Sequence, residues 1–236
     1  TAIDRYKKYK FDKMIYEVGS EQKLHFRQLF KVLELMGHKW SKDCVHVAHG
    51  LYLDKDGKKF ASRKGKTVFM KDVLNETVKL AKKSKVSSDV ALEVARAAIF
   101  YGDLKNQPSK DAIFDIDNFL QFSGDTGPYL LYTYARANSI ISGKSGKVSV
   151  DDLDVCEIEL IKKMGEFSSV VENSMLNPSL VSHYSYELCQ KFNEFYHACK
   201  VIGSSNEKFR IALVKSFMIV LKNSLSLLGI NVVKRM

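Results

Sequence analysis

The chain has 236 residues, 45% of them hydrophobic, and a net charge of +10, so it can bury one large core or two modest ones. No apolar run reaches the roughly 18 residues of a membrane span, and the charged first ten residues are not those of a secretory signal. These properties exclude a membrane or secreted class, and we expect a cytoplasmic protein.

The cysteines and histidines are not spaced as metal ligands usually are. The four cysteines are scattered without a CxxC pair, which argues against a disulfide framework and a structural zinc site. His46 and His49 are three apart in a strand-like run, where alternation sends them to opposite faces. We therefore assign no metal ligand to protein side chains and expect reduced, buried thiols.

The excess positive charge lies near the amino terminus. Up to Lys71 the chain has 17 Lys and Arg against 8 Asp and Glu, whereas the rest has 20 against 19. A basic segment of this kind favours a polyanionic partner.

The first 53 residues alternate between strand and helix signals. Residues 14–18 form a compact β run that stops at Gly19, and apolar residues from Glu21 keep helical spacing until Gly37, a plausible end of the helix. Residues 44–53 read as a second strand. The pattern predicts a β-α-β unit, too small to be a complete nucleotide-binding fold.

A basic loop follows this unit. Five Lys or Arg side chains fall within nine residues, and Gly57 and Gly65 at either end give the backbone freedom to close. Such density suits a triphosphate, although a solvated basic hairpin is the alternative reading of a charge run.

The remainder of the chain reads as helical. Asp89 can cap a first helix, and Asp125 or Thr126 can cap another in which Pro128 fits the first turn. Three long amphipathic patterns then cover residues 156–175, 178–202 and 206–228, which predicts a helical bundle.

Four stretches resemble arginyl-tRNA synthetases, a family of class I aminoacyl-tRNA synthetases. They are residues 18–22 with His25 and Phe26, the loop residues 59–65, the segment 123–129 through Arg136, and residues 192–197 with the tail 221–236. The loop is similar to the class I "KMSKS" loop, with Ser62 and Arg63 in place of its second lysine. The "HIGH" signature is absent from this sequence, so the resemblance is to the carboxy-terminal part of the family.

The resemblance implies an α+β, mostly α fold. Residues 1–70 would be the carboxy-terminal remnant of a Rossmann-type catalytic domain, with the KMSKS-like loop at 57–66. Residues 71–114 would be connecting helices, and residues 115–236 an α-helical anticodon-binding domain. We expect a monomer rather than an oligomer, with no membrane partner.

The implied activity is that of an arginine-tRNA ligase, with ATP, L-arginine and arginine tRNA as partners and Mg²⁺ held mainly through the ATP phosphates. The resemblance places catalytic cations at Lys59, Arg63 or Lys64. It places ATP or arginine contacts at four further residues: Gly19, Glu21, Gln22 and His25. For His25, a helix-capping or core role is an equal alternative.

The resemblance implies anticodon contacts for Tyr196 and Met236. Lys200 lies partly off the apolar stripe and is expected to contact tRNA as a basic side chain near an exposed tyrosine. Tyr129, Tyr132, Tyr134 and Arg136 are expected to be packing and tRNA-backbone groups. Phe192, Phe195, Cys199 and Ile202 recur at helical spacing, so most of that stripe is expected to be core.

Two other function classes stay open from the sequence. A non-catalytic tRNA-binding or scaffold protein would use the basic loop only for electrostatics, and an upstream "HIGH" segment in the reading frame would argue against it. A helical interaction module without a nucleic-acid role leaves the basic amino-terminal third unexplained. The chain alone is predicted to be inactive in arginine activation.

Overall fold

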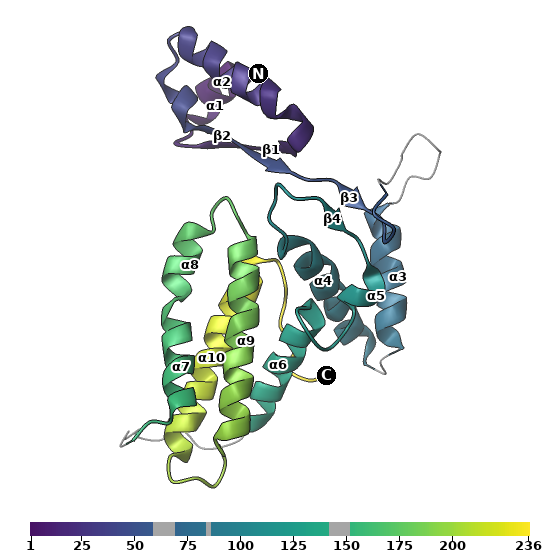
Figure 1. Cartoon of the computed structure of the whole chain (residues 1–236), viewed down its shortest axis with the longest axis vertical. Coiled ribbons are helices and arrows are strands. Elements are labelled where there is room, and N and C mark those ends of the chain that lie inside the picture. Colours follow the sequence, from purple (N-terminus) through teal and green to yellow (C-terminus); the bar gives the residue numbers. More distant parts are fainter. Residues whose placement is uncertain (59–68, 84–85, 142–151) are drawn as a thin grey trace. The chain divides into compact units, whose positions relative to one another are not determined.

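The computed structural model describes residues 1–58, 69–83, 86–141 and 152–236, and the chain divides into two compact units. The first unit contains the described residues 1–58 together with 108–113, and the second contains the other described residues. Figure 1 shows strands in the first unit and helices throughout the second. Within the described ranges, no helix is both long and apolar enough to cross a bilayer.

The first unit is built on a β-α-β motif, as the sequence predicts. Strand β1 (Met14–Gly19) pairs in parallel with β2 (Cys44–His49), and helix α2 (Lys23–Leu35) makes the crossover between them. Helix α2 is followed by Gly37 at a φ of 83°, a left-handed conformation that glycine adopts without strain.

A small aromatic core supports this motif. Leu33, Trp40 and Cys44 are buried, and the ring of Tyr6 stacks on Trp40 with 4.7 Å between centroids. Tyr6 comes from helix α1 (Ala2–Tyr9) and Trp40 from the short turn η2 (Lys39–Asp43), so sequence-distant segments share one core.

The single strand predicted over residues 44–53 is wrong, because the chain turns at Gly50. The Gly50 amide donates to the Pro108 carbonyl at 2.7 Å, and a Cβ at Gly50 would lie 2.1 Å from the Lys110 carbonyl oxygen. Beyond this close approach, strand β3 (Tyr52–Leu53) pairs in parallel with β4 (Ala112–Ile113). Only glycine allows this crossing, since any side chain would collide with backbone atoms.

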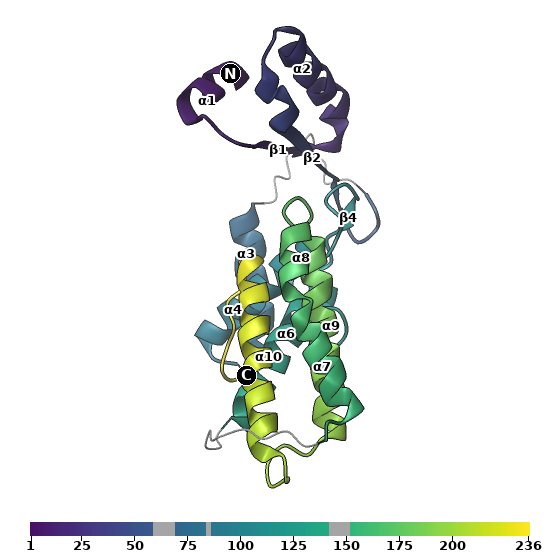
Figure 2. The ribbon, with the colours of Figure 1, turned by 90° about the vertical axis from the view of Figure 1, so that its left-hand side faces the viewer.

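The second unit is helical. Helices α6 (Gly127–Ile140), α7 (Val155–Gly165), α9 (Ser179–Ala198) and α10 (Glu207–Leu227) pack together as a bundle (Figure 2), which confirms the predicted architecture. The other helices of this unit are α3 (Met70–Lys82), α4 (Ser88–Leu104), α5 (Ile116–Phe119) and α8 (Phe167–Asn173).

Two predicted helix boundaries differ from the structure. The cap of α4 is Ser87 rather than Asp89, and its side chain accepts from the Val90 amide at 3.4 Å. The continuous pattern over 156–175 divides into α7 and α8 at Gly165 and Glu166. Glycine is a weak helix former, so this is a natural place for the helix to end.

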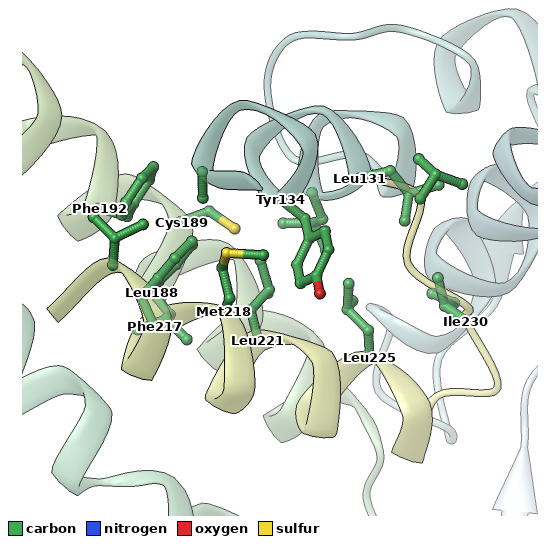
Figure 3. Packing of buried hydrophobic residues seen from close by; sticks show 14 of the residues in the cluster. Leu131, Tyr134, Leu188, Cys189, Phe192, Phe217, Met218, Leu221, Leu225 and Ile230 are labelled. Carbon is green, nitrogen blue, oxygen red and sulfur yellow. The ribbon is translucent and has the colours of Figure 1, made fainter. Parts of the chain in front are cut away.

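The bundle core mixes aromatic and aliphatic side chains from α6, α9 and α10 (Figure 3). Phe192 and Phe217 stack with their ring centroids 4.0 Å apart, and both are fully buried. Phe195 and Cys199 of the predicted stripe are also buried, whereas Ile202 is 47% exposed. Most of the stripe is therefore core, as predicted.

The first helix of the bundle, α6, begins at a well-defined N-cap. Thr126 caps α6 and its hydroxyl accepts from the Tyr129 amide at 3.3 Å, with Pro128 in the first turn. Gly127 lies against α4 so closely that an added Cβ would be 2.1 Å from the Ala97 carbonyl oxygen. This contact fixes the crossing point of α4 and α6.

Candidate nucleic-acid interface

A groove of about 1110 Å³ opens on the second unit. Its walls come from one face of α6, the last turn of α9 and the residues that follow Val233. The lining residues are Tyr132, Ala135, Arg136, Asn138, Ser139, Ile141, Tyr196, His197, Lys234, Arg235 and Met236.

Helical geometry explains one wall. Tyr132, Arg136 and Ser139 are spaced so that they share a face of α6. The segment 234–236 forms another wall, where the Asn138 side-chain amide donates to the Lys234 carbonyl at 3.1 Å. The buried Val233 anchors this segment to the core.

Arg136 lies at the centre of a fixed network. Its guanidinium donates to the Asn193 side-chain carbonyl and to the Tyr132 hydroxyl, both at 3.1 Å. Its Cζ lies 4.8 Å from the Tyr132 ring centroid and 5.5 Å from that of Tyr196, within the range of cation–π attraction.

Asn193 is itself oriented by a hydrogen bond to Tyr129. Its side-chain amide donates to the Tyr129 hydroxyl at 2.8 Å, and burial raises the pKa of the Tyr129 phenol. Tyr129 thus stays neutral at physiological pH, and the orientation of Asn193 presents its oxygen to Arg136.

The groove combines exposed rings with positive charge. Tyr132 is 40% exposed and Tyr196 is 39% exposed, and Arg136, Lys234 and Arg235 supply three cations. None of the described residues that line the groove has an acidic side chain. Stacking surfaces beside cations are the arrangement by which proteins hold single-stranded nucleic-acid bases and their phosphates.

Three of the residues predicted to contact tRNA meet in this groove: Arg136, Tyr196 and Met236. Lys200 is not among the residues that line it. Lys200 lies beyond the end of α9, and its backbone carbonyl accepts from the Arg210 guanidinium at 2.9 Å.

The sequence places Tyr132 among the packing and tRNA-backbone groups, and Asn138, Lys234 and Arg235 are not among the residues predicted to contact tRNA. The four-residue spacing from Tyr132 to Arg136 could have indicated a shared helix face. No local signal brings the tail against α6, because that contact depends on how the bundle packs.

The first unit gathers a second set of predicted residues at the carboxyl ends of its parallel strands. Gly19 of β1 is in register with His49 of β2, and the turn η1 (Ser20–Gln22) follows immediately with Glu21 and Gln22 exposed. Ligands of open α/β sheets bind at this edge, beyond the carboxyl ends of the strands.

His25 lies on the first turn of α2 and is exposed, with its ring 5.3 Å from that of Phe26. It is therefore not a buried core histidine. The capping position of α2 belongs to Gln22, which makes no side-chain cap bond.

The start of the basic loop is a tight turn around Asp54. One oxygen of its carboxylate accepts from the amides of Asp56 and Lys58 at 3.0 and 2.8 Å, and Gly57 has a φ of 74°. The predicted catalytic cations Lys59, Arg63 and Lys64 lie outside the described residues.

Among the described residues, one group of His, Cys, Asp or Glu side chains is close enough to share a metal ion: Asp154, Glu157 and Cys199 in the second unit. The guanidinium of Arg210 donates to both carboxylates at 2.7 Å. A protein cation is therefore already paired with both of these acids.

Comparisons with known proteins agree on one family. The model described as "tRNA synthetases class I (R), catalytic domain" matches residues 1–116, and the "DALR anticodon binding domain" matches residues 130–236. An arginine–tRNA ligase of Clostridium acetobutylicum is 42% identical to this chain, covering 98% of the chain and 44% of that relative.

A second arginine–tRNA ligase, from Clostridium botulinum, is 41% identical over 100% of this chain and 45% of its own length. The solved arginyl-tRNA synthetase of Thermus thermophilus matches with a TM-score of 0.87 at 26% identity, over 96% of this chain and 42% of that one. The chain spans less than half the length of these relatives.

Proposed function

Because the chain belongs to the arginyl-tRNA synthetase family, we propose that its helical unit holds the anticodon arm of arginine tRNA and that its α/β unit forms part of the site that activates arginine. The observation that carries the proposal is the groove in which Arg136, Tyr196 and Met236 meet.

The groove is suited to unpaired bases. A base can stack on the exposed face of Tyr196 or Tyr132, while Lys234 and Arg235 lie within reach of the adjoining phosphates. Asn138 and Ser139 offer hydrogen-bonding groups for base edges. Met236 supplies an adaptable apolar surface against which a base can pack.

The proposed reaction has two steps. The arginine carboxylate attacks the α-phosphorus of ATP to give arginyl-adenylate and pyrophosphate, and arginine is then transferred to the terminal adenosine of its tRNA. Catalysis of the first step rests on positioning and on stabilising the charge that moves onto the pyrophosphate.

In this proposal the basic loop supplies that charge, with Lys59, Arg63 or Lys64 facing the β- and γ-phosphates. Mg²⁺ would be bound mainly by phosphate oxygens.

Residues at the strand ends of the first unit would position the small substrates. Gly19 allows backbone approach to the nucleotide, Glu21 can accept from ribose hydroxyls, and Gln22 can line the arginine pocket. His25, exposed on the first turn of α2, is available for a contact with ATP or arginine. We further propose a monomer that works in the cytoplasm.

The proposal is tested by measuring binding of the 236-residue chain to the anticodon stem-loop of arginine tRNA and to the same hairpin with a replaced anticodon. At fixed salt, the cognate hairpin should bind about 5- to 150-fold more tightly, corresponding to one stacking contact of about 1 to 3 kcal/mol. Equal affinity for both hairpins would contradict anticodon recognition.

A further inference from the structure

Two thiols that are distant in the sequence meet at one edge of the bundle. Cys156 lies on the first turn of α7, and Cys199 caps the carboxyl end of α9. Their sulfur atoms are 2.9 Å apart although 43 positions separate the residues. A disulfide bond is about 2.05 Å long, so small side-chain rotations would bring the two sulfurs within bonding distance.

The pair is open to small molecules from one side. A hollow of about 500 Å³ is lined by both cysteines together with Glu159, Lys191 and Glu194. Cys199 is buried, whereas Cys156 is partly exposed. A small oxidant entering the hollow therefore meets the sulfur of Cys156 first.

The charges around the pair favour this order of reaction. Burial, then the neighbouring Cys156 and Asp154, raise the pKa of the Cys199 thiol, and the cation of Arg210 opposes them. Because the thiolate is the reactive form, Cys199 is a poor first nucleophile in this environment.

Metal binding is the competing use of this cluster. Asp154, Glu157 and Cys199 are mutually close enough to share an ion, but Glu157 is fully buried and its carboxylate accepts from Arg210 Nε at 2.7 Å. Asp154 accepts from Nη2 of the same guanidinium, also at 2.7 Å. A metal ion would have to displace the Arg210 guanidinium from both carboxylates, whereas the two sulfurs can bond to each other without disturbing these ion pairs.

We propose that Cys156 and Cys199 form a reversible disulfide by exchange with low-molecular-weight disulfides. The Cys156 thiolate attacks one sulfur of the disulfide RSSR and releases RS⁻. The Cys199 thiolate then attacks the Cys156 sulfur and releases the second RS⁻. The two cysteines lose two electrons, RSSR gains them, and the protons end on two RSH molecules.

This bond would fasten the start of α7 to the end of α9. Because the sulfurs already touch, oxidation should lock the existing packing instead of moving the helices. Closing a loop of this length is expected to raise the melting temperature of the second unit by about 4 to 16 °C.

The test incubates the folded 236-residue chain with oxidised glutathione and follows intact mass, free thiols and melting temperature. The proposal predicts an intramolecular species lighter by about 2 Da with two of the four thiols lost, reversed by dithiothreitol. Cys156→Ser and Cys199→Ser should each abolish this species, and Cys44→Ala, at the buried thiol of the other unit, should retain it.

Two results would overturn the proposal. One is a wild-type chain that keeps four free thiols, or gains only glutathione adducts, under conditions that oxidise a control dithiol. The other is a 2 Da loss that persists in Cys156→Ser, because the bond would then join other cysteines. Circular dichroism of Cys156→Ser shows first that this variant is folded, so that a 2 Da loss in it cannot come from cysteines that meet only in an unfolded chain.

Discussion

Arg136 is oriented before any ligand arrives. Asn193 and Tyr132 hold its guanidinium at 3.1 Å each, and Asn193 is in turn held by Tyr129. A side chain fixed in this way loses little conformational entropy on binding, so more of its interaction energy appears as affinity. Arg136 therefore orders the aromatic surface of the groove as well as adding charge.

At the basic loop, the relevant residues are Arg63 and Lys64. In an intact arginyl-tRNA synthetase carrying this sequence, Arg63→Met together with Lys64→Met should lower the rate of adenylate formation by about 100-fold or more, with arginine affinity changed far less. Interactions made mainly in the transition state give that separation. Single-turnover kinetics measure both quantities, and an unchanged rate would mean that the loop is a solvated hairpin.

The buried Tyr101 gives a prediction for alkaline pH. Its side chain is fully buried and lies at hydrogen-bonding distance from the Asp125 carboxylate. Burial first, and then Asp125, raise the pKa of Tyr101 far above its usual value. Above about pH 10 the unfolded chain ionises this phenol, while the folded chain keeps it neutral. The contribution of Tyr101 to the free energy of unfolding is therefore fully present below pH 10. It falls as pH rises further, by at most about 1.4 kcal/mol per pH unit.

Tyr101→Phe should be less stable at pH 8, by about 1 kcal/mol, yet should lose less stability between pH 10 and 11.5 than the wild type. Urea unfolding of the two proteins at each pH measures the difference, because all other titrating groups are shared. If the free energies of unfolding of the two proteins fell equally between pH 10 and 11.5, Tyr101 would not be the phenol that stays neutral in the folded chain.

At the scale of elements, the crossing of α4 and α6 depends on Gly127. A Cβ there would lie 2.1 Å from the Ala97 carbonyl oxygen, so Gly127→Ala should destabilise the second unit by about 3 kcal/mol or more as the helices separate. Gly165→Ala is the matched control, because nothing lies within 4 Å of its added Cβ. That variant should be neutral or slightly stabilising. Equal denaturation midpoints for the two variants would show that the crossing tolerates a side chain.

Elements with strong local signals could be predicted from the sequence. Helix α6 begins where Thr126 and Pro128 indicate, and the strand-glycine-helix pattern gives β1 and α2. The division of residues 44–53 could not be predicted, because it depends on the approach of residues 108–110 to Gly50. The short strand β4 has no pattern of its own and exists through its pairing with β3.

Part of the candidate site could likewise be predicted from the sequence, and part could not. Arg136, Tyr196 and Met236 were predicted through the family resemblance, and the structure brings them to one groove. The contribution of Lys234 and Arg235 follows from the packing of the tail beside Asn138, a contact between residues about 96 positions apart. Contacts of such sequence separation leave no periodic signal, so they emerge only from the folded bundle.

At the scale of the whole molecule, the chain spans less than half the length of its relatives and its sequence contains no "HIGH" segment. Among the described residues, the β1–β2 sheet has two strands, whereas a doubly wound nucleotide-binding sheet has several more. We therefore predict that the 236-residue chain alone shows no arginine-dependent ATP–pyrophosphate exchange. If exchange with arginine present exceeds the background measured without arginine, this chain contains a complete activation site.

The central claim is that the groove lined by Tyr196 binds and recognises the anticodon bases. Tyr196 is 39% exposed and Tyr9, in the other unit, is 63% exposed, so Tyr9→Ala is a control that removes an exposed ring that does not line the groove. Circular dichroism establishes that both variants fold before binding is measured.

The decisive measurement is the affinity of wild type, Tyr196→Ala and Tyr9→Ala for the cognate anticodon stem-loop at one salt concentration. Loss of one stacking contact should weaken binding of Tyr196→Ala by about 5- to 150-fold, with a smaller loss for the anticodon-substituted hairpin and no change for Tyr9→Ala. A folded Tyr196→Ala chain that binds the cognate hairpin as tightly as wild type would contradict the account.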